Sequence, residues 1–247
     1  MLLVGLNKTT LLDYPGRVAA TIFTGGCNFR CPFCHNGDLV LRPSAQNTYS
    51  EEEVLSFLRK RKNVLKGVCI SGGEPTLQED LPDFIRKIKK IGYDVKLDTN
   101  GYRPEVLEHF LQDGLVDYVA MDIKNCKEKY GRTVGVDEFV LRNIEESVNI
   151  LLRADIPYEF RTTVVKELHG FEDIVKISEW IAGCQRYFLQ QYRESEQEIR
   201  GIQAEEMCHS REGEKFHAYE KQEMEELLQR IKDLPYVTGE VSLRGID

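Results

Sequence analysis

The stretch Gly25–Asn36, GGCNFRCPFCHN, contains three of the seven cysteines of the chain. It follows Val18–Thr24, an apolar and largely β-branched run that predicts a buried strand. In α/β folds, the loops that leave the carboxyl ends of the strands carry the chemistry. The C-x3-C-x2-C spacing of Cys27, Cys31 and Cys34 therefore predicts a site for a metal or an iron–sulfur cluster after the first strand of such a fold.

After this loop, strand-like and helix-like segments alternate. Apolar runs predict strands at 67–70, 93–97, 116–121, 158–165 and 187–191, and a last strand at 237–243. Helical spacing of apolar residues fills the intervals, and Ser50–Glu53 is a capping box that predicts a helix start. Repeated strand–helix units imply parallel strands with right-handed crossovers. The sequence thus predicts an α/β fold, as a complete or partial barrel or as an open doubly wound sheet.

Length and composition favour a single domain over residues 1–247. The chain has 41% hydrophobic residues, enough for a full core, and it contains no Pro/Gly/Ser-rich linker and no internal repeat. We expect a core of about residues 15–192, followed by a loop, a helix and the last strand in 193–247. The charged stretch Glu194–Glu214 lacks apolar periodicity, which predicts a surface loop.

The charge and the hydropathy pattern exclude several classes of function. A net charge of −8 argues against a nucleic-acid partner, which would require a basic surface. Met1–Leu6 is too short for a signal peptide, and no run approaches the roughly 18 apolar residues of a membrane span. We therefore expect a cytoplasmic protein with no membrane partner.

Three clustered thiolates have two candidate occupants. A structural zinc ion requires four closed ligands, and His35 is poorly placed to reach the ion that Cys34 would bind. A four-iron cluster held by three cysteines leaves one iron free to bind a small molecule. The other cysteines form no ferredoxin-type run, which argues against a second cluster; they are Cys69, Cys126, Cys184 and Cys208.

The cysteine run and the Gly-Gly-Glu-Pro sequence after the next strand resemble the radical S-adenosylmethionine (SAM) superfamily. Residues 8–36, KTTLLDYPGRVAATIFTGGCNFRCPFCHN, resemble more closely the activating enzymes of glycyl radical enzymes. The nearest branch activates anaerobic (class III) ribonucleoside-triphosphate reductase. The likeness extends from about Leu6 to Tyr192 and implies a partial (β/α)6-type parallel barrel.

The resemblance also implies the cofactors and their ligands. Cys27, Cys31 and Cys34 would hold a [4Fe–4S] cluster, and the amino and carboxylate groups of SAM would chelate the open iron. Phe33 would contact the adenine, with His35 beside it on the same loop. Gly72 and Gly73 would present backbone groups to the methionyl amine. The residues assigned to SAM are Phe33, His35, Gly72, Gly73, Glu74, Asp98, Thr99, Asn100, Asp122, Lys124, Arg161 and Thr163.

The resemblance implies individual roles for these residues, and the chemistry of their side chains suits those roles. Glu74 would accept the positive charge of the amine, and Asn100 and Lys124 would hold the ribose and the methionyl carboxylate. Asp98 and Asp122 are hard oxygen ligands, suited to bridging a monovalent or small divalent cation, although both also commonly form turns and salt bridges. An interior Arg161 needs an anionic partner, and we expect the carboxylate of SAM. In part of the family a histidine ends the sixth strand; here the place holds Gln190, Gln191 and Tyr192.

The implied reaction is the activation of a partner enzyme. A low-potential donor such as flavodoxin or ferredoxin would reduce the cluster, and SAM would be cleaved to a 5′-deoxyadenosyl radical that abstracts hydrogen from a glycine of the partner. Asp13, before Pro15-Gly16, would contact the incoming glycine loop beside the cluster. The alternatives are a radical SAM enzyme for a small molecule, such as a deazaguanine-type synthase, a non-catalytic electron carrier, and a zinc-binding module.

Overall fold

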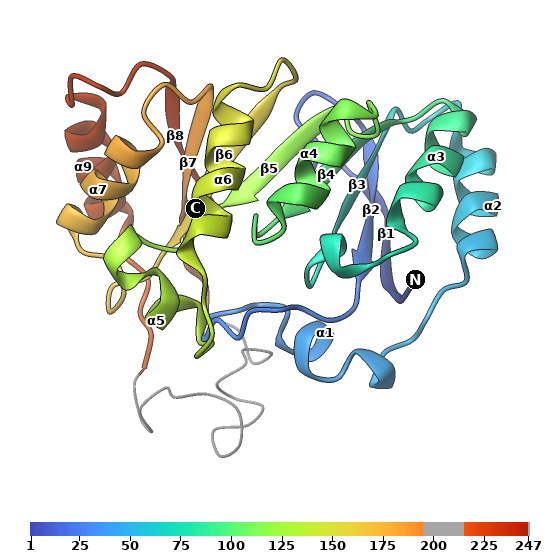
Figure 1. Ribbon diagram of the computed structural model, residues 1–247, viewed down its shortest axis with the longest axis horizontal. Helices are drawn as coiled ribbons and strands as arrows, with labels where there is room; N and C mark the ends of the chain where they lie inside the picture. Colours follow the sequence, from blue (N-terminus) through green and yellow to red (C-terminus); the bar gives the residue numbers. More distant parts are fainter. Residues whose placement is uncertain (195–214, 247) are drawn as a thin grey trace.

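The computed structural model describes residues 1–194 and 215–246, and its strands form one eight-stranded sheet in the order β1 to β8 (Figure 1). Strand β1 runs antiparallel to β2, and every later neighbour pair is parallel. The strands are β1 (Leu3–Thr10), β2 (Ala19–Thr24), β3 (Gly67–Gly72), β4 (Asp94–Thr99), β5 (Tyr118–Asp122), β6 (Tyr158–Val164), β7 (Arg186–Gln191) and β8 (Glu240–Arg244).

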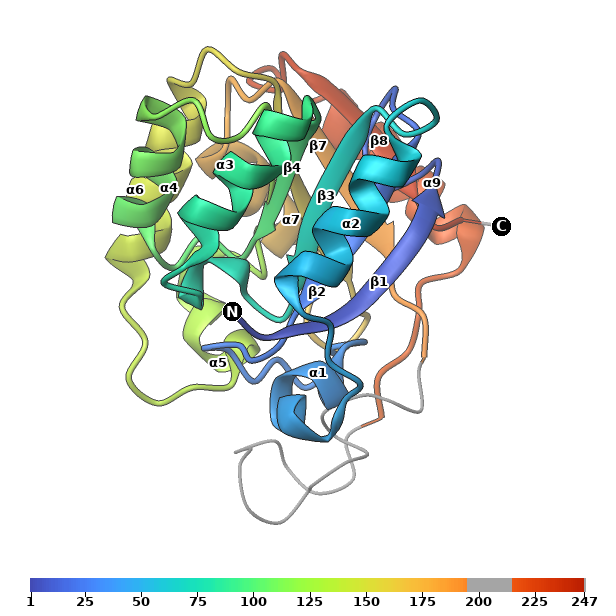
Figure 2. The same ribbon diagram turned by 90° about the vertical axis from the view of Figure 1, so that its right-hand side faces the viewer.

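The helices that connect the parallel strands cover the outer face of the sheet (Figures 1 and 2). Ser50 and Glu53 form the predicted capping box at the start of α2. Two short helices, α1 (Gly37–Leu41) and α5 (Tyr130–Val134), lie in the loops. The others are α2 (Glu51–Arg61), α3 (Leu81–Ile91), α4 (Pro104–Gln112), α6 (Leu141–Leu152), α7 (Phe171–Trp180) and α9 (Lys221–Lys232).

The sheet curls into a partial barrel. In a flat sheet, β2 and β5 would lie about 14 Å apart, since neighbouring strands are about 4.8 Å apart. The rings of Tyr14, which precedes β2, and Tyr118 of β5 have centroids only 5.9 Å apart. The described strands β1 and β8 form the two edges of the sheet. This arrangement, with β2–β7 as six consecutive parallel strands, confirms the predicted α/β barrel class.

Alternation along the strands separates an apolar outer face from a polar interior. On β4, Val95 and Leu97 are fully buried in the core that the sheet shares with the helices. Lys96 and Asp98, which alternate with them, form an ion pair with each other and face the interior. The chain thus places charged side chains inside the barrel, directly below the loops at the carboxyl ends of the strands.

The structure also departs from the sequence-based prediction at both ends of the chain. Strand β1 was not predicted, because Asn7, Lys8 and Thr9 are exposed and interrupt the apolar pattern. The predicted last strand exists, but at Glu240–Arg244. Most of the charged stretch that was expected to form a surface loop lies outside the described residues. None of the described helices is both long and apolar enough to cross a bilayer.

Candidate functional site

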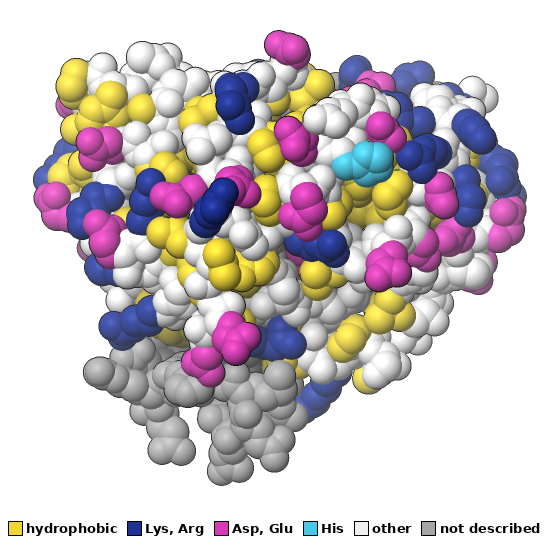
Figure 3. Space-filling view, in the orientation of Figure 1, with side chains coloured by type: hydrophobic (Ala, Val, Ile, Leu, Met, Phe, Trp, Pro, Cys, Tyr) yellow, Lys and Arg dark blue, Asp and Glu magenta, His cyan; other side chains and the backbone are white. Residues whose placement is uncertain are grey.

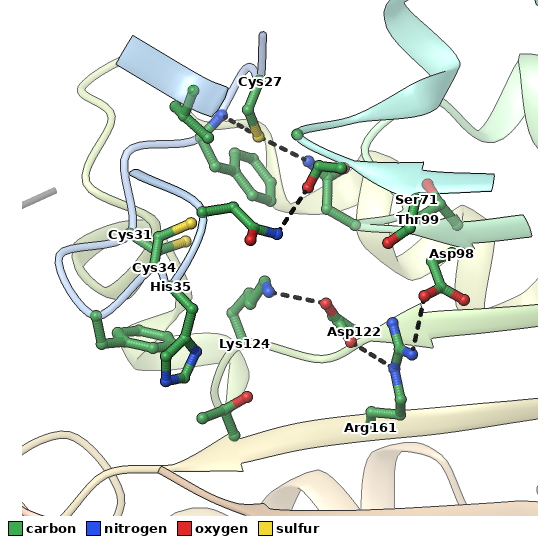
Figure 4. A pocket seen from close by; sticks show the side chains of 18 of the residues that line it. Cys27, Cys31, Cys34, His35, Ser71, Asp98, Thr99, Asp122, Lys124 and Arg161 are labelled. Carbon is green, nitrogen blue, oxygen red and sulfur yellow. Dashed lines mark hydrogen bonds and ion pairs between the residues drawn. The ribbon is translucent and has the colours of Figure 1, made fainter. Parts of the chain in front are cut away.

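The carboxyl ends of the parallel strands surround one cavity of about 250 Å³ (Figure 4). All three predicted metal ligands and all but one of the predicted SAM-binding residues line it; the exception is Glu74. Side chains that are far apart in the sequence meet here because each follows a parallel strand. The predicted residues at the cavity are Cys27, Cys31, Phe33, Cys34, His35, Gly72, Gly73, Asp98, Thr99, Asn100, Asp122, Lys124, Arg161 and Thr163.

The Gly-Gly turn after β3 packs directly against the cysteine loop. A Cβ atom on Gly73 would lie only 2.0 Å from the carbonyl oxygen of Gly26, and one on Gly72 would lie 2.3 Å from that of Thr24. The backbone N–H of Glu74 donates to the same Gly26 carbonyl at 2.8 Å. Gly72 also has a φ of +119°, which disfavours any residue with a side chain. The two loops can therefore approach this closely only because glycines occupy the contact.

The three thiols face the cavity, with Cys31 buried and Cys27 and Cys34 partly exposed (Figure 4). Burial, together with a smaller effect of the nearby Glu74 carboxylate, raises the pKa of Cys27 to about 12, and burial also raises the pKa of Cys31. The Cys27 sulfur accepts hydrogen bonds from the backbone N–H of Phe29 at 3.3 Å and from the Asn100 amide at 3.8 Å. Among the described residues, no three Cys, His, Asp or Glu side chains converge as a site for a single ion.

These observations fit an iron–sulfur cluster. The three thiols surround a cavity and do not converge on a single point, as a cluster of several atoms requires. N–H donors already contact the Cys27 sulfur, and the glycine turn lets the backbone lie close to the cysteine loop. The raised pKa values mean that the buried thiols stay protonated unless a positive centre stabilises the thiolates, which a metal cluster does.

Arg161 of β6 joins the two aspartates at the ends of β4 and β5. Its Nε lies 2.8 Å from Asp122, and a terminal nitrogen lies 3.3 Å from Asp98 (Figure 4). Lys124 adds a contact to Asp122 at 3.0 Å. Burial alone would raise the pKa of Asp122, but Arg161 and Lys124 lower it to about 2. The Arg161 guanidinium thus occupies the place between the two carboxylates where the sequence analysis expected a bound cation. The arrangement of the described residues does not support a cation site there.

The remaining predicted residues form the rest of the cavity wall. The Asn100 side chain donates to Asn28 at 2.8 Å, which ties the end of β4 to the cysteine loop. Phe33 is buried, and its ring packs edge-on against His169 with centroids 6.4 Å apart. His35 is exposed; its ring stacks near Tyr192 and contacts the carbonyl of Arg193.

Two predicted residues do not reach the cavity. Asp13 lies in the loop before β2, whereas the cysteine loop follows β2, and it is not among the residues that line the cavity, so its contact with a glycine loop stays a prediction. Its carboxylate accepts from the Thr21 hydroxyl, and its carbonyl accepts from Lys96 at 2.6 Å. Glu74 is buried behind the cavity wall. There its carboxylate accepts hydrogen bonds from Thr76, Thr99 and the Asn100 backbone.

Replacing Glu74 by glutamine tests whether this side chain is a scaffold or a SAM ligand. The amide keeps the shape but loses one acceptor oxygen, so a buried donor at Thr76 or Asn100 is left without a partner. We expect the free energy of unfolding to fall by about 1–3 kcal/mol in urea titrations. A direct contact with SAM would instead weaken SAM binding, measured by calorimetry, while leaving the stability of the SAM-free protein unchanged.

Four residues at the cavity were missed by the sequence analysis, and a fifth, Gln190, was named only as one of three residues at the end of the sixth parallel strand. Of Gln190, Gln191 and Tyr192, only Gln190 lines the cavity. It pairs with Thr163 across β6 and β7 and shares its inward face, whereas the side chain of Gln191 donates to the Tyr219 carbonyl. Alternation along β6 identifies Arg161 and Thr163 as interior residues. The sequence alone does not give the register between β6 and β7, which is needed to place Gln190 beside Thr163. The five are Phe29, Asn36, Val40, Ser71 and Gln190.

Curated relatives fall into two groups. The chain is 35% identical over 196 residues to the "Putative glycyl-radical enzyme activating enzyme" of Methanocaldococcus jannaschii, covering 77% of this chain and 80% of that protein. It is 36% identical over 170 residues to a "Probable GTP 3′,8-cyclase" of Thermococcus kodakarensis, covering 66% of this chain and 53% of the cyclase. The chain thus spans only about half the length of the cyclase.

Solved structures confirm the fold. Streptococcus suis SuiB matches 90% of this chain with a TM-score of 0.66 at 15% identity, and the match covers 47% of SuiB. The structure titled "Native anSMEcpe with bound AdoMet" matches 89% of this chain and 62% of its own, with a TM-score of 0.58 at 17% identity. The family model "Radical SAM superfamily" matches residues 21–181, which include the cysteine loop and the ends of β3 to β6. The chain belongs to the radical SAM superfamily.

Proposed function

We propose that this protein activates a glycyl radical enzyme, the anaerobic ribonucleoside-triphosphate reductase, by removing a hydrogen atom from one glycine of that partner. Its likeness to an M. jannaschii protein named as an activating enzyme supports this, over most of both chains. Further support comes from the Asp13–Gly16 and Asp98–Gly101 sequences, which resemble those of activating enzymes. A low-potential protein such as flavodoxin or ferredoxin would supply the electron.

Different residues of the cavity would hold the cluster and SAM. Cys27, Cys31 and Cys34 would hold the [4Fe–4S] cluster that the family implies, and the backbone of Gly72 and Gly73 would accept the amino group of SAM. Together, the bound cluster and SAM supply a reductively generated carbon radical that abstracts hydrogen. The protein contributes position and charge: Lys124 and Arg161 offer cations to the SAM carboxylate, while Asp98 and Asp122 fix their orientation.

The observation that favours a protein substrate over a nucleotide is the balance of charge inside the barrel. A triphosphate carries several negative charges and needs spare cations, preferably Arg or Lys, to bind it. Each of the four described interior cations already contacts a carboxylate, and two of them, Lys124 and Arg161, are also assigned to the carboxylate of SAM, which leaves none to spare for a triphosphate. The pairs are Lys96 with Asp98 at 3.4 Å, Lys124 with Asp122 at 3.0 Å, Arg161 with Asp122 at 2.8 Å, and Arg244 with Glu159 at 2.5 Å. Binding of a neutral peptide loop in this interior therefore costs less electrostatic free energy than binding of GTP.

Isotope transfer tests the proposal directly. The reduced protein and SAM are mixed anaerobically with a ribonucleotide reductase that contains α-deuterated glycine. We expect deuterium in the 5′-deoxyadenosine, detected by mass spectrometry, together with a glycine-centred radical on the reductase, detected by electron paramagnetic resonance. The α-hydrogen of glycine is a suitable target, since both flanking amides stabilise the resulting radical.

The matched control is the same reductase with its radical-bearing glycine replaced by alanine, which should yield neither deuterium transfer nor the radical signal. Cleavage of SAM without deuterium transfer would show that this reductase is the wrong partner. If no glycyl radical enzyme of the same cell gives transfer, the activase assignment fails. Turnover of GTP in that case would place the chain with the cyclases instead.

A further inference from the structure

A group of cations that form no ion pair among the described residues gathers at the end of the barrel opposite the cavity. We call it the basic face: Lys8, Lys60, Arg61, Lys62, Lys66 and Lys90. Neighbouring cations are paired, as in Arg17 with Asp94, Arg59 with Glu52 and Lys89 with Asp117. None of the six forms an ion pair with a carboxylate in the part of the chain that the structure describes. Figure 3 shows many Lys and Arg side chains at the upper right, over the ends of α2 and α3, with Asp and Glu side chains among them.

Contacts between separate elements hold this face together. Arg61 at the end of α2 donates to the Thr9 hydroxyl, next to Lys8 on β1, at 3.4 Å. Lys62 donates to the carbonyl of Gly92, two residues after Lys90 of α3. The backbone N–H of Lys66 donates to Val18, just before β2, at 2.8 Å. The six cations therefore belong to one surface rather than to scattered positions.

Exposed apolar side chains lie on the same surface. Leu11 is 71% exposed, Leu12 87% and Val64 51%, and these are three of the four large hydrophobic residues exposed in the described chain. The leucines sit in the loop between β1 and β2, which also carries Asp13, and Val64 follows α2. Apolar side chains surrounded by charged ones have the composition of a protein–protein interface.

We propose that the basic face docks an acidic surface of the glycyl radical enzyme. This rests on the proposed function and adds where, and by what chemistry, the partner binds. The chain carries a net charge of −8, so the rest of its surface repels an acidic partner and leaves this face as the attractive one. The leucines favour a protein over a polyphosphate chain, which offers no apolar group to cover them.

The position of the face separates docking from chemistry. Strand β2 has six residues and so spans about 20 Å between the loop at the basic face and the cysteine loop. A large partner can cover this distance, and changes at the basic face should leave the cavity intact. Loss of the face should therefore weaken the use of the partner without affecting cleavage of SAM.

Charge reversal with a matched control tests the proposal. In Lys60→Glu/Lys66→Glu, Lys60 lies in the last turn of α2, and Lys66 is an exposed residue immediately before β3. The control Lys215→Glu/Lys232→Glu makes the same charge change, with Lys232 in the last turn of α9. We expect the first variant to raise the KM for the reductase about tenfold at low salt, with a smaller effect at high salt, and the control to change it little. Leu12→Ser should also raise this KM.

The readouts distinguish the possible failures. Both double variants should cleave SAM with dithionite at the wild-type rate, and calorimetry should show weaker reductase binding only for Lys60→Glu/Lys66→Glu. If the wild type activates the reductase and both variants do so equally well, the basic face is not the docking site. If the wild type never activates it, the proposed function fails and this inference with it. If flavodoxin reduces Lys60→Glu/Lys66→Glu more slowly than the wild type, the face binds the electron donor instead. Likewise, binding of RNA or of anionic vesicles that depends on Lys60 and Lys66 would assign the face to that ligand.

Discussion

Alanine at Cys27, Cys31 or Cys34 is expected to remove the iron–sulfur cluster and, with it, all cleavage of SAM. Each thiol lines the same cavity, and three cysteines are the minimum set for a cluster with one open iron. Loss of one leaves two protein ligands, and the described side chains that line the cavity offer no fourth thiol. Anaerobic reconstitution followed by iron and sulfide analysis measures the cluster, and formation of 5′-deoxyadenosine measures the reaction.

Two buried cysteines outside the cavity are the controls. Cys126 contacts Asp173, and Cys184 packs in the core, so Cys126→Ala and Cys184→Ala should retain both iron and activity. Full iron content in a Cys27, Cys31 or Cys34 variant would remove that residue from the ligand set. Loss of about half the iron in either control would instead indicate a second metal site. Of the two remaining cysteines, Cys69 is fully buried in β3, and Cys208 lies outside the described residues.

The second large effect is expected for Arg161→Leu. The guanidinium is only 12% exposed and separates two carboxylates that would otherwise face each other. Removing one partner of a buried ion pair leaves an uncompensated charge, so we expect the free energy of unfolding to fall by about 3–5 kcal/mol at pH 7. Affinity for SAM should fall as well. Urea titrations of the SAM-free protein separate the first effect from the second.

The stabilities of the wild type and of Arg161→Leu should change in opposite directions as the pH falls. In the wild type, the pKa of Asp122 lies below its ordinary value of 3.8, so its contribution to stability is present at neutral pH and is lost as the pH falls from about 4 to 2. In Arg161→Leu, burial acts with less opposition and the pKa of Asp122 rises, so the variant should gain stability as the pH falls from 7. The two stabilities should therefore converge toward pH 4. Arg161→Lys, which keeps the charge, should lie between them, and a constant difference across this range would contradict the ion-pair explanation.

Local patterns in the sequence predict most of the fold and most of the cavity. Apolar runs identified the parallel strands, and the rule that strand ends converge identified which polar residues would meet. Gly72 and Gly73 could be assigned through the resemblance to the superfamily, which implies that their backbone groups contact the methionyl amine. The structure adds the reason they are needed, which is the 2.0 Å approach between a Cβ at Gly73 and the Gly26 carbonyl.

Partnerships between distant side chains could not be predicted. The sequence places Arg161 inside the barrel and requires an anionic partner, but whether that partner is a cofactor or Asp98 and Asp122 depends on the curvature of the sheet. Glu74 follows the same rule: a carboxylate after a strand is expected at the cavity, yet a turn of a few residues directs it toward Thr76 and Thr99. The position of Asp13 required β1 to be recognised as an antiparallel strand.

The pairing of Glu159 with Arg244 also affects the order in which the interior can form during synthesis. Glu159 is fully buried in the interior, and β8 supplies the guanidinium that neutralises it, 85 residues later in the chain. At a synthesis rate of about 5–20 residues per second, Arg244 is made about 4–17 s after Glu159. During that interval β6 carries a carboxylate without this counter-charge, so the interior of the barrel cannot close in its final form before Arg244 has been made. Completion of the polar interior must follow the synthesis of β8.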